Sequence, residues 1–191
     1  MTENLKSTAI TNLDAVPPVR ATAGLGGAGH VQSIYGTVVP VTAATAGSTY
    51  RMVRLPTSCS IKHVILDFTG GGTITHFNMD ITLYYSDQTL DEVGAASGDT
   101  GVVNSLSTTA SLFASAIDLT TDSTVGTFYE MTNVSNNYKP SARNKQLWDA
   151  AGLSSDPGGF FDVTIVTVTN DNSFSAALTV GLEVQFVMPY V

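Results

Sequence analysis

Apolar residues recur in short runs from residue 34 to the C-terminus, and clusters of Gly, Ser, Asn and Asp separate these runs. The last run, 177–188, alternates most regularly between apolar and polar positions. Its apolar positions are Leu178, Val180, Leu182, Val184, Phe186 and Met188. A period of two is that of a β-strand with one buried face, so the pattern predicts an all-β, antiparallel β-sandwich. The eight or nine predicted strands span 34–41, 49–55, 61–68, 76–85, 102–106, 112–119, 126–131, 161–169 and 177–188.

One short segment has the pattern of a helix instead. Ser141 or Asn144 can cap residues 145–151 at their start, and Gly152 can end them in a left-handed conformation. The side of this helix that faces the sandwich would carry Leu147, Trp148 and Ala151. A lone Trp beside Leu on a short helix usually fills a core, so we expect one short helix that plugs the sandwich.

Residues 1–33 show neither pattern. Prolines at 17 and 18 and a glycine-rich stretch at 24–29 oppose both a helix and a β-ladder. The segment still carries spaced apolar residues, which fit either ordering on contact with another surface or a mobile terminus. These candidate contact residues are Leu5, Ile10, Leu13, Val16 and Val19. We therefore expect an extended N-terminal arm over 1–33 and one β-sandwich domain over 34–191, a length that suits a single core.

The net charge of the chain limits the kinds of molecule that it can bind. The chain has 8 Lys and Arg against 16 Asp and Glu, a net charge of −8, and no Lys or Arg occurs from His63 to Tyr138. This balance repels nucleic acid and anionic membranes and attracts cations or basic protein surfaces. A single cysteine, Cys59, excludes an intramolecular disulfide, and no apolar run reaches the roughly 18 residues that span a bilayer. We expect a soluble protein that folds in a reducing cytoplasm, with neither nucleic acid nor membrane as partner.

The segments 61–68 and 76–85 are separated by a short glycine-containing loop, which predicts a β-hairpin. A symmetric loop places His63 opposite Asp80 and Asp67 opposite His76, all four on the outward face. Two His and Asp pairs could hold a metal ion or make an interface sensitive to pH. The spacing matches no known metal motif, so cross-strand polar pairing at a partner interface is the preferred interpretation.

No motif in the sequence indicates catalysis. A Gly-x-Ser-x-Gly nucleophile turn is missing, and Cys59 has only His63 near it in sequence. The glycines at 24–29 lack the preceding strand, the following helix and the Lys of a phosphate loop, and the acidic stretch 87–99 lacks the residue order of a calcium loop. We therefore expect no enzymatic activity, no cofactor and no bound metal.

Three stretches of the chain form recognisable motifs, which follow one another from about residue 35 to the C-terminus. The first is Tyr35-Gly36-Thr37-Val38 followed by Tyr50-Arg51-Met52-Val53-Arg54-Leu55-Pro56 and Ile61-Lys62. The second is Leu112-Phe113-Ala114-Ser115-Ala116-Ile117-Asp118-Leu119. The third is Asn144-Lys145-Gln146-Leu147-Trp148-Asp149-Ala150-Ala151-Gly152-Leu153 with Asp156-Pro157 and Phe161-Asp162-Val163. In content and in order, these stretches resemble a family of head proteins of tailed bacteriophages, known as capsid decoration, cement or head-stabilising proteins.

The resemblance implies a jelly-roll-like sandwich that binds the outer surface of an assembled capsid, bridges coat subunits and stabilises the shell. The implied partners are the major capsid protein and further copies of this chain, as a trimer or another cyclic oligomer. The implied location is the virion, assembled in the host cytoplasm. The alternative is a carbohydrate- or receptor-binding sandwich of a phage tail or fibre, which would use the acidic stretch 87–99 and the aromatic rings of Tyr84 and Tyr138.

Overall fold

The computed structural model describes residues 4–7, 10–11, 14–15, 30–40, 45–69, 74–76, 78–86, 112–118, 128–134, 138–168, 173–174 and 178–189. The strands are β1 (Asn4–Lys6), β2 (Val31–Val38), β3 (Thr49–Pro56), β4 (Ser60–Thr69), β5 (Ile74–His76), β6 (Asn78–Tyr85), β7 (Ala114–Asp118), β8 (Phe128–Glu130), β9 (Phe160–Thr167), β10 (Ser173–Phe174) and β11 (Thr179–Val187). A 3-10 helix, η3 (Pro140–Asn144), precedes the short helix α2 (Leu147–Ala150).

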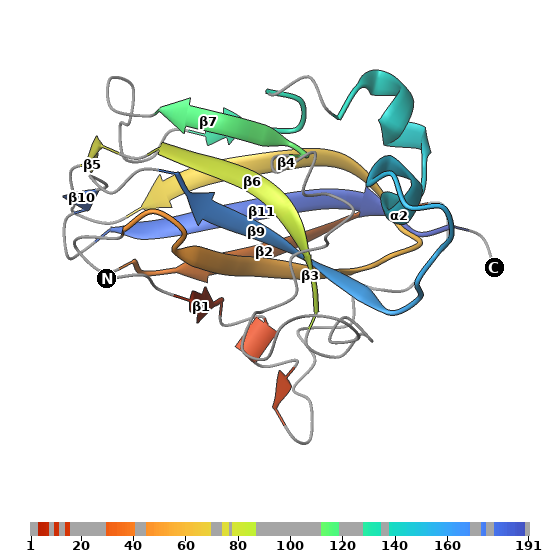
Figure 1. The fold of residues 1–191 in the computed structure, drawn as a ribbon, viewed down its shortest axis with the longest axis horizontal. Helices are drawn as coiled ribbons and strands as arrows, with labels where there is room; N and C mark the ends of the chain where they lie inside the picture. Colours follow the sequence, from red (N-terminus) through yellow and green to blue (C-terminus); the bar gives the residue numbers. More distant parts are fainter. Residues whose placement is uncertain are drawn as a thin grey trace.

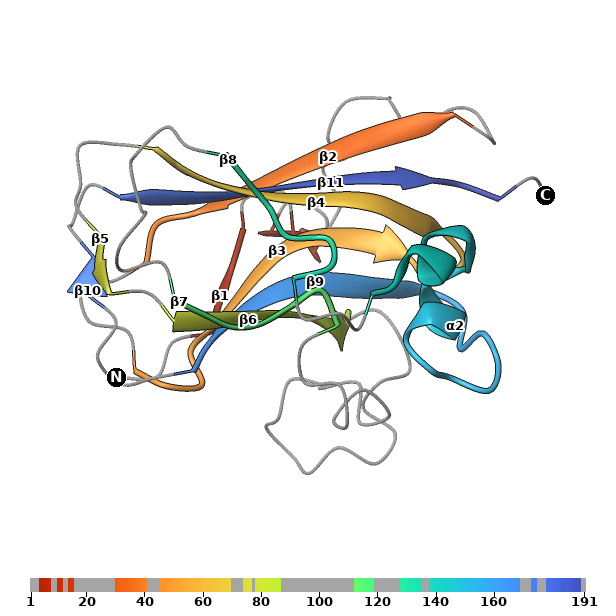
Figure 2. The ribbon, with the colours of Figure 1, turned by 90° about the horizontal axis from the view of Figure 1, so that it is seen from above.

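Two sheets face each other across the core (Figure 1, Figure 2). Sheet A has the strand order β1-β3-β9-β6-β7, and sheet B has the order β2-β11-β4-β8. The short strands β5 and β10 pair with each other, and α2 lies at one end of the sandwich. The prediction of an all-β sandwich with one short α-helix is confirmed for the described part of the chain.

The strand order is that of a jelly roll. Apart from the arm strand β1 and the short β5 and β10, the chain pairs its first strand with its last, β2 with β11, and its second with its second to last, β3 with β9. The next pairs inward are β4 with β8 and β6 with β7, and all four pairs are antiparallel. This nesting describes one long hairpin that is rolled up, so that successive pairs fall in alternate sheets.

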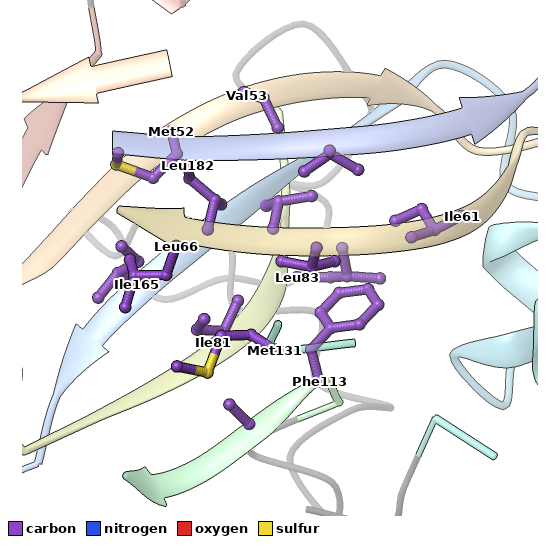
Figure 3. Close-up of a cluster of buried hydrophobic side chains, with 14 of the residues drawn as sticks. Met52, Val53, Ile61, Leu66, Ile81, Leu83, Phe113, Met131, Ile165 and Leu182 are labelled. Atoms are coloured by element: carbon purple, nitrogen blue, oxygen red, sulfur yellow. The ribbon is translucent and has the colours of Figure 1, made fainter. Parts of the chain in front are cut away.

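The core lies between the inner faces of the two sheets (Figure 3). The alternation predicted for the last strand is confirmed, because Leu178, Val180, Leu182, Val184 and Phe186 are all buried and Met188 packs partly against them. Apolar side chains of β4 and β6 meet them from both sheets. They are Val64, Leu66 and Phe68 of sheet B, and Met79, Ile81 and Leu83 of sheet A.

The predicted hairpin between 61–68 and 76–85 is wrong. β4 pairs with β11 and β8 in sheet B, whereas β6 pairs with β9 and β7 in sheet A. The two strands face each other across the core instead of lying side by side. Alternation in sequence specifies which side chains are buried, and it is the same for strands that pair and for strands that oppose each other.

The predicted helix is shorter than expected. Gln146, not Ser141 or Asn144, is the residue before its first turn, and no side chain caps it. Gly152 does adopt the predicted left-handed conformation, with φ of 81°. The predicted packing face is confirmed, since Leu147 and Ala151 are buried and Trp148 packs partly against the core. The predicted strand 102–106 and the acidic stretch 87–99 lie outside the described residues.

Gly36 sets how closely β2 approaches β3. A Cβ atom at this position would overlap the backbone carbonyl oxygen of Met52 and would also press on the side chain of Val53. Sheet B and sheet A therefore converge at this edge of the sandwich, where only a residue without a side chain fits.

We expect Gly36→Ala to lower the free energy of unfolding by about 3 kcal/mol, because a backbone carbonyl cannot move aside as a flexible side chain does. Denaturant unfolding of the full chain measures the loss. Gly47→Ala is the matched control: no atom lies within 4 Å of the added Cβ. Its left-handed φ costs about 1 kcal/mol. Equal losses in the two variants would contradict the close approach of β2 to β3.

Candidate interaction surface and buried charge network

The N-terminal residues add a strand to sheet A. β1 pairs with β3 in parallel, Leu5 opposite Tyr50, and the Ser7 amide donates to the Arg51 carbonyl oxygen at 2.6 Å. The Ser7 hydroxyl donates to the carbonyl oxygen of Met52. This strand covers the edge of β3, which would otherwise expose unpaired backbone groups.

Two of the five predicted contact residues of the arm thus lie against the sandwich of the same chain. Leu5 is partly buried on the core, and Ile10 is fully buried. In this arrangement Ile10 presents no surface to a partner. Leu13, Val16 and Val19 lie outside the described residues.

A buried ion network connects β3, β9 and the arm. Asp162 of β9 accepts from Arg51 Nη1 at 3.1 Å, and from Arg54 Nε at 2.8 Å and Nη2 at 3.1 Å. The side chains of both arginines and of Asp162 are almost completely shielded from solvent. Arg54 also pairs with Asp14, which in turn accepts from Lys6 Nζ at 3.0 Å.

A β-bulge brings the two arginines together. Arg51 lies opposite Thr164 and Arg54 lies opposite Asp162, and the register shifts between Arg51 and Val53. Residues three apart on a regular strand point to opposite faces, and the extra residue at the bulge restores them to the same one. Both guanidinium groups therefore project from the outer face of sheet A, where Arg51 also stacks 5.7 Å from the ring centroid of Tyr84.

Sequence reasoning missed this network. The sequence nevertheless contains an indication of the network. Two arginines lie within the apolar run 49–55, and Asp162 is the one acid within the run 161–169. Charged residues are rarely buried unless they are paired, so an acid and a base in two runs that read as core strands indicate that those strands meet.

We expect Asp162→Asn to lower the free energy of unfolding by about 3–5 kcal/mol, because it removes the carboxylate that the two buried guanidinium groups share. Thermal or denaturant unfolding measures this loss. Asp149→Asn provides the comparison, because Asp149 forms an exposed pair with Lys145 at 2.9 Å. Such surface pairs contribute about 0.5 kcal/mol. If the two variants lost the same stability, the network would not be a main support of the fold.

The ionised state of Asp14 is coupled to arm docking. Burial pushes the pKa of Asp14 upward, but hydrogen bonds from Lys6 and Arg54 outweigh it, and the net pKa lies below the usual 3.8. A carboxyl group with a lowered pKa in the folded state stabilises that state above its ordinary pKa, and this contribution disappears as the pH falls through the lowered value.

The difference in unfolding free energy between the wild-type chain and Asp14→Asn should therefore depend on pH. We expect the wild type to be more stable at pH values above 3.8, with the difference vanishing in stronger acid. Parallel denaturant titrations of both chains across this range provide the measurement. A difference that stayed constant with pH would show that the Asp14 carboxylate does not hold the arm.

The predicted His and Asp pairs do not form. His63 Nδ1 lies 2.9 Å from Glu130 Oε2 of β8, and Asp67 accepts from the Tyr35 hydroxyl of β2 at 2.9 and 3.0 Å. The Tyr35 side chain reaches Asp67 across Gly181, where an added Cβ would overlap both side chains. His63 and Asp67 therefore share the outer face of sheet B, as expected, but with partners that the hairpin register did not indicate.

Asp80 and His76, the other two residues of the predicted pairs, do not lie on the outer face of sheet B. Asp80 is on the outer face of sheet A, where it accepts from the Ala116 amide at 2.7 Å and where burial raises its pKa. His76 belongs to β5, opposite Ser173 of β10. The four predicted residues thus divide between different sheets because β4 and β6 belong to opposite sheets.

The two outer faces differ in their exposure. On sheet A the outward side chains of Arg51, Thr82, Tyr84, Asp162 and Thr164 are all buried. On sheet B the outward positions of β2 and β8 include exposed apolar side chains, with Val31 63%, Tyr35 46% and Phe128 72% exposed. We name this surface the B face. It consists of Val31, Ser33, Tyr35, His63, Ile65, Asp67, Phe128, Glu130, Glu183 and Gln185.

The two aromatic residues suggested for sugar binding are buried, and so is Cys59. Tyr84 lies beneath Arg51, and the Tyr138 hydroxyl donates to the Ile61 carbonyl oxygen in the core, so neither ring offers the exposed platform that the alternative function requires. Burial raises the pKa of the Cys59 thiol to about 12. In the described part of the chain, no three His, Cys, Asp or Glu side chains come together as a metal site, and no helix is long and apolar enough to span a membrane.

Comparison of the structure with solved structures finds a protein of similar fold. A chain in the capsid of Ralstonia phage GP4 superposes with a TM-score of 0.60 at 16% sequence identity, over 98% of this chain and 99% of that one. A chain in the capsid asymmetric unit of cyanophage Pam1 matches over 92% of this chain and 97% of that one, at 18% identity and a TM-score of only 0.36. No protein family and no curated protein sequence matches the chain.

Proposed function

We propose that this chain is a non-enzymatic structural protein of a phage capsid, which attaches to the outer surface of the shell and bridges coat subunits. The observation that supports the proposal most strongly is the likeness to a chain of the Ralstonia phage GP4 capsid, which extends over nearly the whole of both chains. It agrees with the resemblance of three sequence stretches to decoration proteins.

The internal chemistry of the chain supports the same conclusion. The only thiol is buried, and its raised pKa keeps it protonated at neutral pH, so it is not an activated nucleophile. Asp162 pairs with Arg51 and Arg54 out of contact with solvent, and Asp14 also pairs with Arg54. They hold strands together and are not available to a substrate.

Attachment to a lattice suits a small domain with modest contacts. A shell presents many equivalent sites, and an oligomer of this chain would engage several at once, which raises the effective concentration at each site. The partners in this proposal are the major capsid protein and further copies of the chain in a trimer or another cyclic oligomer, and the location is the virion. Leu13, Val16 and Val19 of the arm are candidate contacts with either partner.

The test is binding to empty shells assembled from the major coat protein encoded in the same genome. We expect the purified chain to co-sediment with the shells, to saturate at a fixed ratio to coat subunits, and to raise the temperature at which the shells disassemble. Free coat subunits serve as the control, because bridging requires neighbouring subunits and so predicts weaker binding to them. Failure to bind shells at any ratio would contradict the proposed function.

A further inference from the structure

The B face combines exposed apolar side chains with a one-sided charge. Its acidic members are Asp67, Glu130 and Glu183, and β2, β8 and β11 contain no Lys or Arg. The one Lys of β4, Lys62, donates to the carbonyl oxygen of Arg143. His63 is the one basic side chain of the face, and it already lies against Glu130.

At the centre of the B face, an aliphatic side chain lies between two acidic residues. Ile65 of β4 lies opposite Glu183 of β11 on one side and opposite Glu130 of β8 on the other. Directly opposite residues of neighbouring strands point to the same side, with their Cβ atoms about 5 Å apart. A partly buried aliphatic side chain is therefore bracketed by two carboxylates, and Tyr35 extends the row beyond Glu183.

The carboxylates are held in place before any partner arrives. Glu183 Oε1 accepts from the Ser33 hydroxyl at 2.6 Å and from Gln185 Nε2 at 3.2 Å. Its second oxygen, Oε2, accepts no hydrogen bond from the residues that the structure describes. Side chains that are already fixed lose little conformational entropy on binding, which favours association.

Glu130 remains ionised at neutral pH. Burial pushes its pKa upward, but hydrogen bonds from Thr132 and His63 outweigh this effect and lower the net pKa. The Glu130 carboxylate beside Ile65 is thus available as a fixed negative charge at neutral pH.

We propose that the B face is the surface by which this chain attaches to coat protein, and that its occupant is a protein surface with protruding Lys or Arg side chains. The proposal rests on the proposed function and specifies its contact. The aliphatic stem of a Lys or Arg packs on Ile65 while its charged head pairs with Glu183 or Glu130. Apolar side chains of the partner cover Val31, Tyr35 and Phe128, whose exposed rings and methyl groups are typical of interface centres.

Charge complementarity excludes other occupants of the B face. Phosphate groups of nucleic acid or of an anionic membrane would be repelled there by Asp67, Glu130 and Glu183. A second copy of the chain that docked the same face onto itself would bring Glu183 and Glu130 against like charges, which is unfavourable.

The experiment compares two charge reversals of equal size in the full chain, with shells of the coat protein encoded in the same genome as the probe. Glu183→Lys changes the B face, and Asp149→Lys changes an exposed position on α2 at the end of the sandwich. We expect Glu183→Lys to weaken shell binding at low salt by about tenfold or more. Binding of the wild type and of Asp149→Lys should both weaken as salt rises, and that of Glu183→Lys should weaken less, because only Glu130 then remains beside Ile65.

A second variant tests the apolar part of the face independently of charge. Phe128→Ser removes a side chain that is 72% exposed, so folding should be retained and the thermal midpoint unchanged. We expect weaker binding to shells at all salt concentrations, because the lost contact is apolar.

The outcomes separate this inference from the proposed function. If the wild-type chain binds shells and both Glu183→Lys and Phe128→Ser bind equally well, attachment stands and the B face is not the contact. If the wild-type chain does not bind shells, both proposals fail. If sedimentation shows that the free chain self-associates and that Glu183→Lys abolishes this, the face joins copies of the chain and the coat-protein assignment is overturned.

Discussion

The carboxylate of Asp162, held between two buried arginines, is the interaction on which the remaining structure depends. It pairs with both Arg51 and Arg54 on a face that would otherwise have to remain in water. Because that face is dry, the arm can lie along the edge of β3 and bring Asp14 to Arg54. A buried ion pair contributes little net stability over apolar packing, but it allows only one arrangement of the strands that carry it. The network thus specifies how β3, β9 and the arm fit together.

The sequence predicted the strands well and their pairing poorly, for a physical reason. Burial of alternate side chains is a local property, and the run that ends at Met188 shows it clearly in both sequence and structure. Pairing depends on how the chain rolls up, which places β4 and β6 on opposite sides of the core. Val64 of β4 and Ile81 of β6 are buried either way, so no pattern within these strands distinguishes a hairpin from a sandwich.

The same limit applies to the candidate surface. His63 and Asp67 could be placed on an outward face from alternation alone, and they do lie there. Their true neighbours, Glu130 and Tyr35, are distant in sequence and meet them only because β8 and β2 belong to sheet B. The buried arginines escaped prediction because a bulge at Met52 changes which residues share a face, and a bulge leaves no regular signal in a period of two.

The charged side chains of the described strands are arranged differently on the outer faces of the two sheets. Arg51 and Arg54 project from sheet A, where they pair with Asp162 out of solvent, and Arg54 also pairs with Asp14. Because no Lys or Arg occurs from His63 to Tyr138, the outward side chains of β4 and β8 include the acids Asp67 and Glu130 but no Lys or Arg from this stretch. Glu183 of β11 adds to the same side. Asp67, Glu130 and Glu183 therefore place negative charge on the sheet whose outer face is exposed, and a partner that approaches this face is oriented by its own positive charge before apolar contacts form.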